Sequence, residues 1–126
     1  MKRTIATDQA PRAIGPYSQA VRAGELVFCS GQLGMDPGSG QLVGPDAGKQ
    51  AEQCLMNLQA VLEAAGFGLE DVVKTTVFLT DMNDFGEVNA AYGLVFTVDP
   101  PARSAVAVAA LPKGAKVEIE AIACRS

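Results

Sequence analysis

The residue that most clearly suggests a chemical role is Arg103, which lies in the segment P-P-A-R-S-A-V at residues 100–106. It is followed by a run of small apolar residues, A-V-A-V-A-A-L, which is typical of a buried strand. A guanidinium cannot lose its charge, so at a largely buried position it needs an anionic partner. That partner is either a carboxylate of the protein or the carboxylate of a ligand, held by two parallel hydrogen bonds.

Two carboxylates stand in the last apolar segment, V-E-I-E-A-I-A-C at residues 117–124. Glu118 and Glu120 are two residues apart, so they share one face of a predicted strand. A carboxylate on a strand this apolar is expected to have a partner or a chemical task. An ion pair with a lysine such as Lys116 is the alternative, and for Glu120 alone it is the favoured interpretation.

Four further residues are candidates for the lining of a site. Tyr17 follows G-P and could offer a hydroxyl or an aromatic wall, although most tyrosines beside prolines simply pack. Ser30 precedes Gly31 at a predicted strand end, where glycine permits a ligand to approach the backbone. An ordinary turn serine is the alternative for Ser30. Asn89, on a predicted helix, is similarly ambiguous.

The composition argues against several kinds of chemistry. The sequence has no histidine, which removes the commonest general base and the commonest metal ligand. The three cysteines, Cys29, Cys54 and Cys124, lack metal-type spacing and are expected to be reduced, buried thiols. P-loop, dinucleotide-binding and nucleophile-elbow motifs are missing. We therefore predict neither a metal nor a cofactor.

The length and net charge of the chain limit the number of domains and the kinds of partner that it can bind. A chain of 126 residues corresponds to one domain, which we expect to span residues 1–126. The formal net charge is −4, a poor electrostatic basis for nucleic-acid binding. No apolar stretch approaches the roughly 20 residues of a membrane helix, and no signal peptide is evident. These features predict a cytoplasmic protein.

The predicted helices and strands that position these candidate site residues follow one another in an order typical of an α+β fold. A helix is predicted over residues 46–65 because apolar residues recur there at spacings of three and four, with Gly66 as its C-terminal cap. A second helix follows Asn83 or Asp84, and R-A-G-E is a predicted hairpin turn. Strands are predicted at residues 2–7, 18–21, 25–30, 71–80, 103–110 and 117–124.

The strand predicted at residues 103–110 is apolar on both faces, so both faces should be covered. Two helices can cover only one side of such a sheet. We expect another copy of the chain to cover the other side, which predicts a homo-oligomer. A long loop folded over that side is the alternative.

Six segments spread over essentially the whole chain form a distinctive set: G-P-Y-S (15–18), C-S-G-Q (29–32), T-V-F-L-T-D-M-N-D-F (76–85), V-N-A-A-Y (88–92), P-P-A-R-S (100–104) and L-P-K-G-A-K-V-E-I-E-A-I-A (111–123). Together they resemble the RidA/YjgF family of reactive-intermediate deaminases. The resemblance implies a chorismate-mutase-like α+β fold, with a mixed sheet of about six strands packed on two helices. It also implies a homotrimer around a central barrel, with clefts between neighbouring subunits.

The resemblance further implies hydrolytic deamination of 2-imino acids and their enamine tautomers to 2-keto acids and ammonia, without a cofactor. By motif, Arg103 would hold the substrate carboxylate and Glu118 would orient the attacking water. The remaining site positions carried over from the family are Tyr17, Ser30, Gly31, Asn89 and Ala105.

One position departs from the family pattern. Archetypal members often read A-R-S-C, whereas this chain has Ala105 in place of that cysteine. We expect the chemistry to survive, since a protonated imine carbon is electrophilic enough for direct attack by water. A cleft that binds 2-keto acids without turnover, or a chaperone-like trimer, is the alternative. A ribonuclease, a role the family has also been given, is disfavoured by the low positive charge and the absence of histidine.

Overall fold

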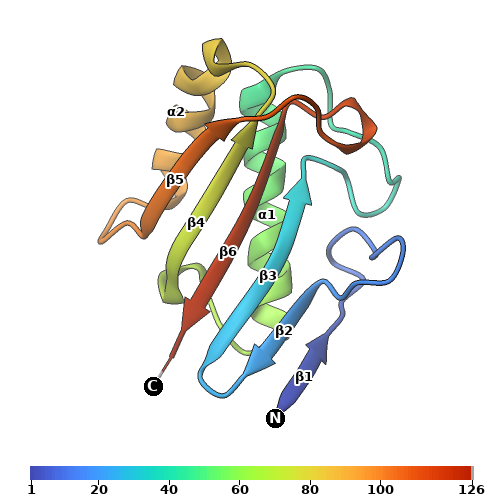
Figure 1. The fold of residues 1–126 in the computed structure, drawn as a ribbon, viewed down its shortest axis with the longest axis vertical. Coiled ribbons are helices and arrows are strands. Elements are labelled where there is room, and N and C mark those ends of the chain that lie inside the picture. The colour runs from blue at the N-terminus through green and yellow to red at the C-terminus, as the bar shows by residue number, and fades with distance from the viewer. Residues whose placement is uncertain (126) are drawn as a thin grey trace.

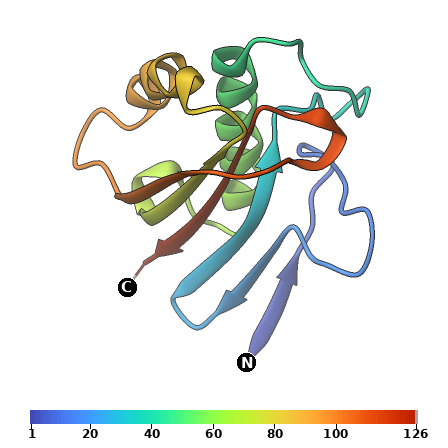
Figure 2. The same ribbon diagram turned by 45° about the horizontal axis from the view of Figure 1, so that its top comes forward.

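A computed structural model describes residues 1–125 of the chain. Its centre is a six-stranded mixed sheet in the order β1-β2-β3-β6-β4-β5 (Figure 1). Two helices lie against one face of this sheet and leave the other face open (Figure 2). The predicted α+β fold is confirmed. The elements are β1 (Lys2–Ile5), β2 (Ala20–Ala23), β3 (Leu26–Leu33), α1 (Ala47–Ala64), β4 (Val72–Leu79), α2 (Phe85–Val95), β5 (Ala102–Ala107) and β6 (Val117–Cys124), with short 3₁₀ helices η1 (Leu69–Asp71), η2 (Met82–Asp84) and η3 (Pro112–Gly114).

Helix α1 forms where predicted because its apolar stripe faces the core. The stripe residues are all buried: Ala51, Cys54, Leu55, Leu58, Val61, Leu62 and Ala65. Full burial of each leucine stabilises the fold by roughly 1.5–3 kcal/mol. The chain leaves the helix through Gly66, whose φ of 82° is a conformation that glycine adopts without strain. Within residues 1–125, no helix has the length and apolar character needed to span a membrane.

The strands β2 and β3 form the predicted hairpin. Ala23 is paired with Leu26, and Gly24 takes the positive φ of 63° that the tight turn requires. Strand β3 runs farther than predicted, to Leu33, through an irregular register between Cys29 and Gln32. The prediction that Ser30 ends a strand was therefore wrong, because a bulge rather than a turn accommodates this stretch.

Strand β5 is an edge strand that pairs in parallel with β4 alone. It ends at Ala107, three residues earlier than predicted. Ala105 is half-buried against the core, but the other residues of β5 are exposed. Within one chain the helices lie on only one face of the sheet, as expected, and coverage of the other face by a second copy stays a prediction. Phe28 and Val106 remain 43% and 44% exposed on the open face, so within residues 1–125 no loop covers the sheet at these two positions. Figures 1 and 2 show the strands of this face uncovered by helices.

The three thiols have different environments. Cys29 and Cys54 are buried as predicted, and burial raises the pKa of the Cys29 thiol to about 12. Burial raises the pKa of Cys54 as well. Cys124 is exposed, contrary to the prediction, because the last residue of β6 alternates onto the open face of the sheet.

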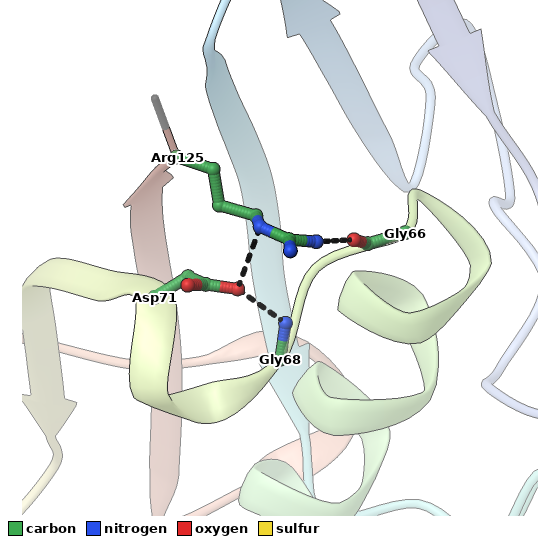
Figure 3. Close-up of polar contacts among 4 residues, drawn as sticks. All are labelled: Gly66, Gly68, Asp71 and Arg125. Atoms are coloured by element: carbon green, nitrogen blue, oxygen red, sulfur yellow. Dashed lines mark hydrogen bonds and ion pairs between the residues drawn. The ribbon is translucent and has the colours of Figure 1, made fainter.

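The end of β6 is attached to the loop that follows α1 (Figure 3). The Arg125 side chain donates to the Gly66 carbonyl, and its Nε lies 3.8 Å from Asp71 Oδ2. The same carboxylate oxygen accepts a hydrogen bond of 2.9 Å from the backbone amide of Gly68. Within residues 1–125, Arg125 and Asp71 form the only ion pair.

Candidate functional site

One cavity brings together four of the predicted site residues. Tyr17, Ser30, Gly31 and Glu118 all line it, and its volume is about 460 Å³. They come from three separate parts of the chain: the loop before β2, the bulged part of β3 and the start of β6. We call this cavity the acid pocket, after the carboxylate of Glu118. Apolar side chains also line it: Pro11, Ile14, Leu33, Met35 and Pro112.

Glu118 lies directly against the backbone of Gly31. A Cβ atom placed on Gly31 would lie 2.8 Å from Glu118 Cδ, closer than real Cβ contacts. Glycine at this position therefore makes room for the carboxylate group itself. Gly31 was predicted to admit a ligand to the backbone, whereas the group that approaches it is the Glu118 side chain of the same protein.

Ser30 and Tyr17 form the wall beside this carboxylate. The Ser30 hydroxyl donates a hydrogen bond of 2.6 Å to the Ser18 carbonyl, which fixes its orientation and leaves its oxygen free to accept. The Ser30 amide donates to the Gln19 carbonyl at 2.9 Å. Tyr17 is 53% exposed, and its hydroxyl accepts a hydrogen bond of 3.4 Å from the Ile14 amide. Both side chains are therefore accessible from the pocket.

Desolvation raises the pKa of Glu118, and the nearby charge of Glu120 raises it further. Within residues 1–125 neither glutamate forms an ion pair, so the alternative of a pair with Lys116 is not realised. A carboxyl group with a raised pKa is a stronger base than an ordinary glutamate, which is the property required of a group that accepts a proton. Glu118 thus has the properties of an acid–base group.

Arg103 lies elsewhere, in a group of residues that we call the arginine platform. Its Nη1 donates a hydrogen bond of 2.7 Å to Asn89 Oδ1. The guanidinium carbon lies 4.8 Å from the ring centroid of Tyr92 and 5.4 Å from that of Phe85, distances at which a cation is attracted to an aromatic face. Arg103 is exposed in the chain, so the expectation of a largely buried position was wrong: β5 is an edge strand.

Arg103 also has no carboxylate partner within residues 1–125. The alternative of an ion pair inside its own chain is therefore excluded for this part of the protein. Its contacts are neutral, so its full charge remains available to an anionic ligand or to another chain.

The acid pocket and the arginine platform lie on opposite faces of the sheet. Arg103 is paired with Thr75, whose hydroxyl contacts Tyr92 of α2, so both point to the helix side. Glu118 alternates with the buried residues Val117 and Ile119 and points to the open side. A single chain therefore does not bring Arg103 and Asn89 together with Tyr17, Ser30, Gly31 and Glu118.

Two cations at the acid pocket were missed by the sequence analysis. Arg12 and Lys113 line the cavity together with Glu118. Lys113 has a φ of 61° and is followed by Gly114 at 68°, a tight turn that brings η3 to the pocket. The P-K-G turn signal could have indicated a special backbone at Lys113, whereas nothing in the sequence distinguishes Arg12. Within residues 1–125, no three side chains of the metal-binding types gather closely enough to hold an ion.

The family model described as endoribonuclease L-PSP matches residues 7–125. The chain belongs to this family, the RidA/YjgF family. Among curated members, it is 54% identical to the RutC family protein y4sK of Sinorhizobium fredii over 122 residues, which is 97% of each chain. It is also 54% identical to the mouse protein named 2-iminobutanoate/2-iminopropanoate deaminase, with 98% of this chain and 91% of that protein aligned.

Solved structures of RidA/YjgF members have the same fold. The YjgF gene product of E. coli superimposes with a TM-score of 0.95 at 51% identity, covering 98% of this chain and 99% of that one. The E. coli protein TdcF, solved with bound serine, superimposes with a TM-score of 0.94 at 46% identity and the same coverage.

Proposed function

We propose that this protein hydrolyses reactive 2-imino acids and their enamine tautomers, of the 2-aminoacrylate type, to 2-keto acids and ammonia. The observation that carries the proposal is a pair of charged groups that form no ion pair within residues 1–125: Arg103 of the arginine platform, and Glu118 in the acid pocket. Relatives at 53–54% identity are named 2-iminobutanoate/2-iminopropanoate deaminase, which supports the same reaction here.

The active site is assembled between two copies of the chain. Because the arginine platform and the acid pocket lie on opposite faces of one sheet, they can meet only when a second copy covers the open face. The exposed apolar side chains of that face, among them Phe28 and Val106, favour such a contact. We propose the homotrimer that the family implies, with one cleft at each subunit interface.

In this cleft, Arg103 of one copy binds the substrate carboxylate through two charge-assisted hydrogen bonds. A proton from solvent adds to C3 of the enamine and yields the iminium form, whose C2 is electrophilic. A water molecule oriented by Glu118 of the other copy adds to C2 while the carboxylate accepts its proton. The resulting carbinolamine takes up that proton on nitrogen and releases ammonia, while its hydroxyl proton returns to solvent, which leaves the 2-keto acid. Overall, one water is consumed for each ammonia released.

Ala105 is compatible with this sequence of steps. The water adds directly to carbon, so no covalent intermediate and no cysteine nucleophile are required. Ala105 is half-buried beside the platform and packs against the core. The proposal therefore assigns it a role in shaping the site rather than in bond making.

The test is the substitution Arg103→Ala, assayed with 2-iminopropanoate generated in situ. Loss of the bidentate contact and of substrate positioning should lower the rate about a hundredfold or more. The oligomer should persist in light scattering, and Arg3→Ala, which removes another exposed arginine of an edge strand, is the matched control. Undiminished turnover by Arg103→Ala would contradict the proposal. Wild-type protein that binds pyruvate but releases no ammonia would favour the keto-acid-binding alternative.

A further inference from the structure

In the arginine platform, three side chains of α2 contact the guanidinium of Arg103. Phe85, Asn89 and Tyr92 recur at spacings of four and three, so they form one face of α2 beneath β5. All three contact the guanidinium of Arg103, one through a hydrogen bond and two through their rings. A long, exposed side chain on an edge strand is thereby held in one orientation.

The platform is itself anchored in the core. The Tyr92 hydroxyl and Thr75 Oγ1 are 2.7 Å apart and share a hydrogen bond, and both residues are at least 95% buried. On its other side, the Tyr92 ring lies 4.7 Å from the ring of Phe96, centroid to centroid. Thr75 is the β4 residue paired with Arg103 of β5. The residue that fixes Tyr92 in the core is therefore the direct neighbour of Arg103 across the two strands.

Every partner in this platform is neutral. Asn89 offers an amide oxygen, which orients the guanidinium without neutralising it as a carboxylate would. The hydrogen bond to Asn89 uses one of the five N–H donors, which leaves the others for a ligand. The only acidic residue in the first turn of α2, Glu87, instead accepts a hydrogen bond of 3.0 Å from the Gly48 amide.

We propose that Asn89, Tyr92 and Thr75 are positioning residues that hold the Arg103 guanidinium in its ligand-binding orientation before the substrate arrives. This inference rests on the proposed function and gives Asn89 a role different from the direct substrate contact predicted from the sequence. Preorganisation lowers the ordering cost of binding, so its loss should weaken binding more than it slows the chemical step.

The primary variant is Asn89→Ala, because Asn89 is exposed and alanine favours helices, so the variant should fold normally. We expect KM for 2-iminopropanoate to rise about 10- to 150-fold, the range given by one hydrogen bond to a charged group, with a smaller change in kcat. Asn89→Asp should raise KM more strongly, because its carboxylate would compete with the substrate for Arg103. Asn83→Ala, at an exposed asparagine just before α2, is the matched control and should leave KM unchanged.

A double-mutant cycle with Arg103→Ala separates positioning from direct contact. If Asn89 acts through Arg103, then Asn89→Ala causes no further loss in the Arg103→Ala background. An equal loss in both backgrounds would overturn the proposal, since Asn89 would then contact the substrate itself.

A measurement that needs no turnover keeps this inference distinct from the proposed function. Side-chain ¹⁵N relaxation of the Arg103 guanidinium should show restricted motion in the wild-type protein. Asn89→Ala and Tyr92→Leu should each increase that motion, while Asn83→Ala should not. A guanidinium that is equally ordered in these variants would overturn the positioning role. Inactivity of the wild-type protein toward all imines would instead contradict the proposed function alone.

Discussion

The acid pocket and the arginine platform position their charged groups in different ways. In the acid pocket the backbone does most of the positioning: a bulge in β3, a glycine that makes room for a carboxylate, and a tight turn at Lys113. In the arginine platform the side chains of α2 hold a cation on a regular edge strand. Neither charge is paired within residues 1–125. Both charged groups are therefore available for the shared cleft that we propose between two copies of the chain.

The largest expected effect comes from inactivating the arginine platform and the acid pocket in separate variants and then mixing the two variants. Arg103→Ala and Glu118→Gln should each lower activity about a hundredfold when all subunits carry the same change. When the two variants are refolded together in equal amounts, about a quarter of the clefts in a cyclic oligomer should combine two intact halves. Activity should therefore return to about a quarter of the wild-type value, measured as ammonia release.

The result of mixing distinguishes a site shared between two chains from a site contained in one chain. Recovery requires that Arg103 and Glu118 of one site come from different chains. If mixing restores nothing while the mixed oligomer is verified by mass spectrometry, the site does not combine two copies.

A smaller effect tests the backbone positioning in the acid pocket. Gly31→Ala should displace the Glu118 carboxylate and lower kcat by roughly tenfold or more, since small misplacements of a catalytic group are costly. The melting temperature should change little, because the atoms that must move belong to the end of a flexible side chain. Steady-state kinetics and thermal denaturation check the two expectations.

A second glycine provides the control for that substitution. Gly86 lies in α2 and has no atom within 4 Å of an added Cβ. Gly86→Ala should stabilise the protein by about 0.5–1 kcal/mol, because alanine loses less backbone entropy in a helix. Its activity should match that of the wild type. A Gly31→Ala enzyme with full activity would show that the Glu118 position is not critical.

The smallest effect concerns pH. Protonated Glu118 cannot accept the proton of water, so kcat/KM should fall as the pH falls through its pKa. Because the pKa is raised, this decline should begin at a higher pH than for an ordinary glutamate. Glu120→Gln removes the nearby like charge, so the decline should move to lower pH. Desolvation, the larger cause of the raised pKa, remains in this variant, so only part of the shift should disappear. A pH–rate profile that does not move would show that the charge of Glu120 does not affect the pKa of Glu118.

The fold was predictable from the sequence wherever a periodic pattern was long. The stripe of α1 and the bounds of β6 follow from spacing alone, because each buries one face against the core. The extension of β3 beyond Ser30 was not predictable, since a bulge is set by the partner strand rather than by local propensity.

Four residues of the acid pocket, Tyr17, Ser30, Gly31 and Glu118, were predictable by resemblance, but their arrangement relative to Arg103 was not. The motifs name the residues, and only the strand register places Arg103 and Glu118 on opposite faces. The exposure of Arg103 and Cys124 was missed for a related reason. Apolar neighbours in sequence indicate a strand, but they do not say whether that strand is central or at an edge.

The burial of Cys29 and Cys54 has a consequence for a protein that is proposed to bind electrophiles. A thiol reacts as its thiolate, and burial keeps these two sulfur atoms protonated at neutral pH. They are therefore shielded from alkylation by the unsaturated compounds that the site is proposed to consume. Cys124 is the thiol that a single chain leaves exposed, and it lies at the far end of β6 from Glu118.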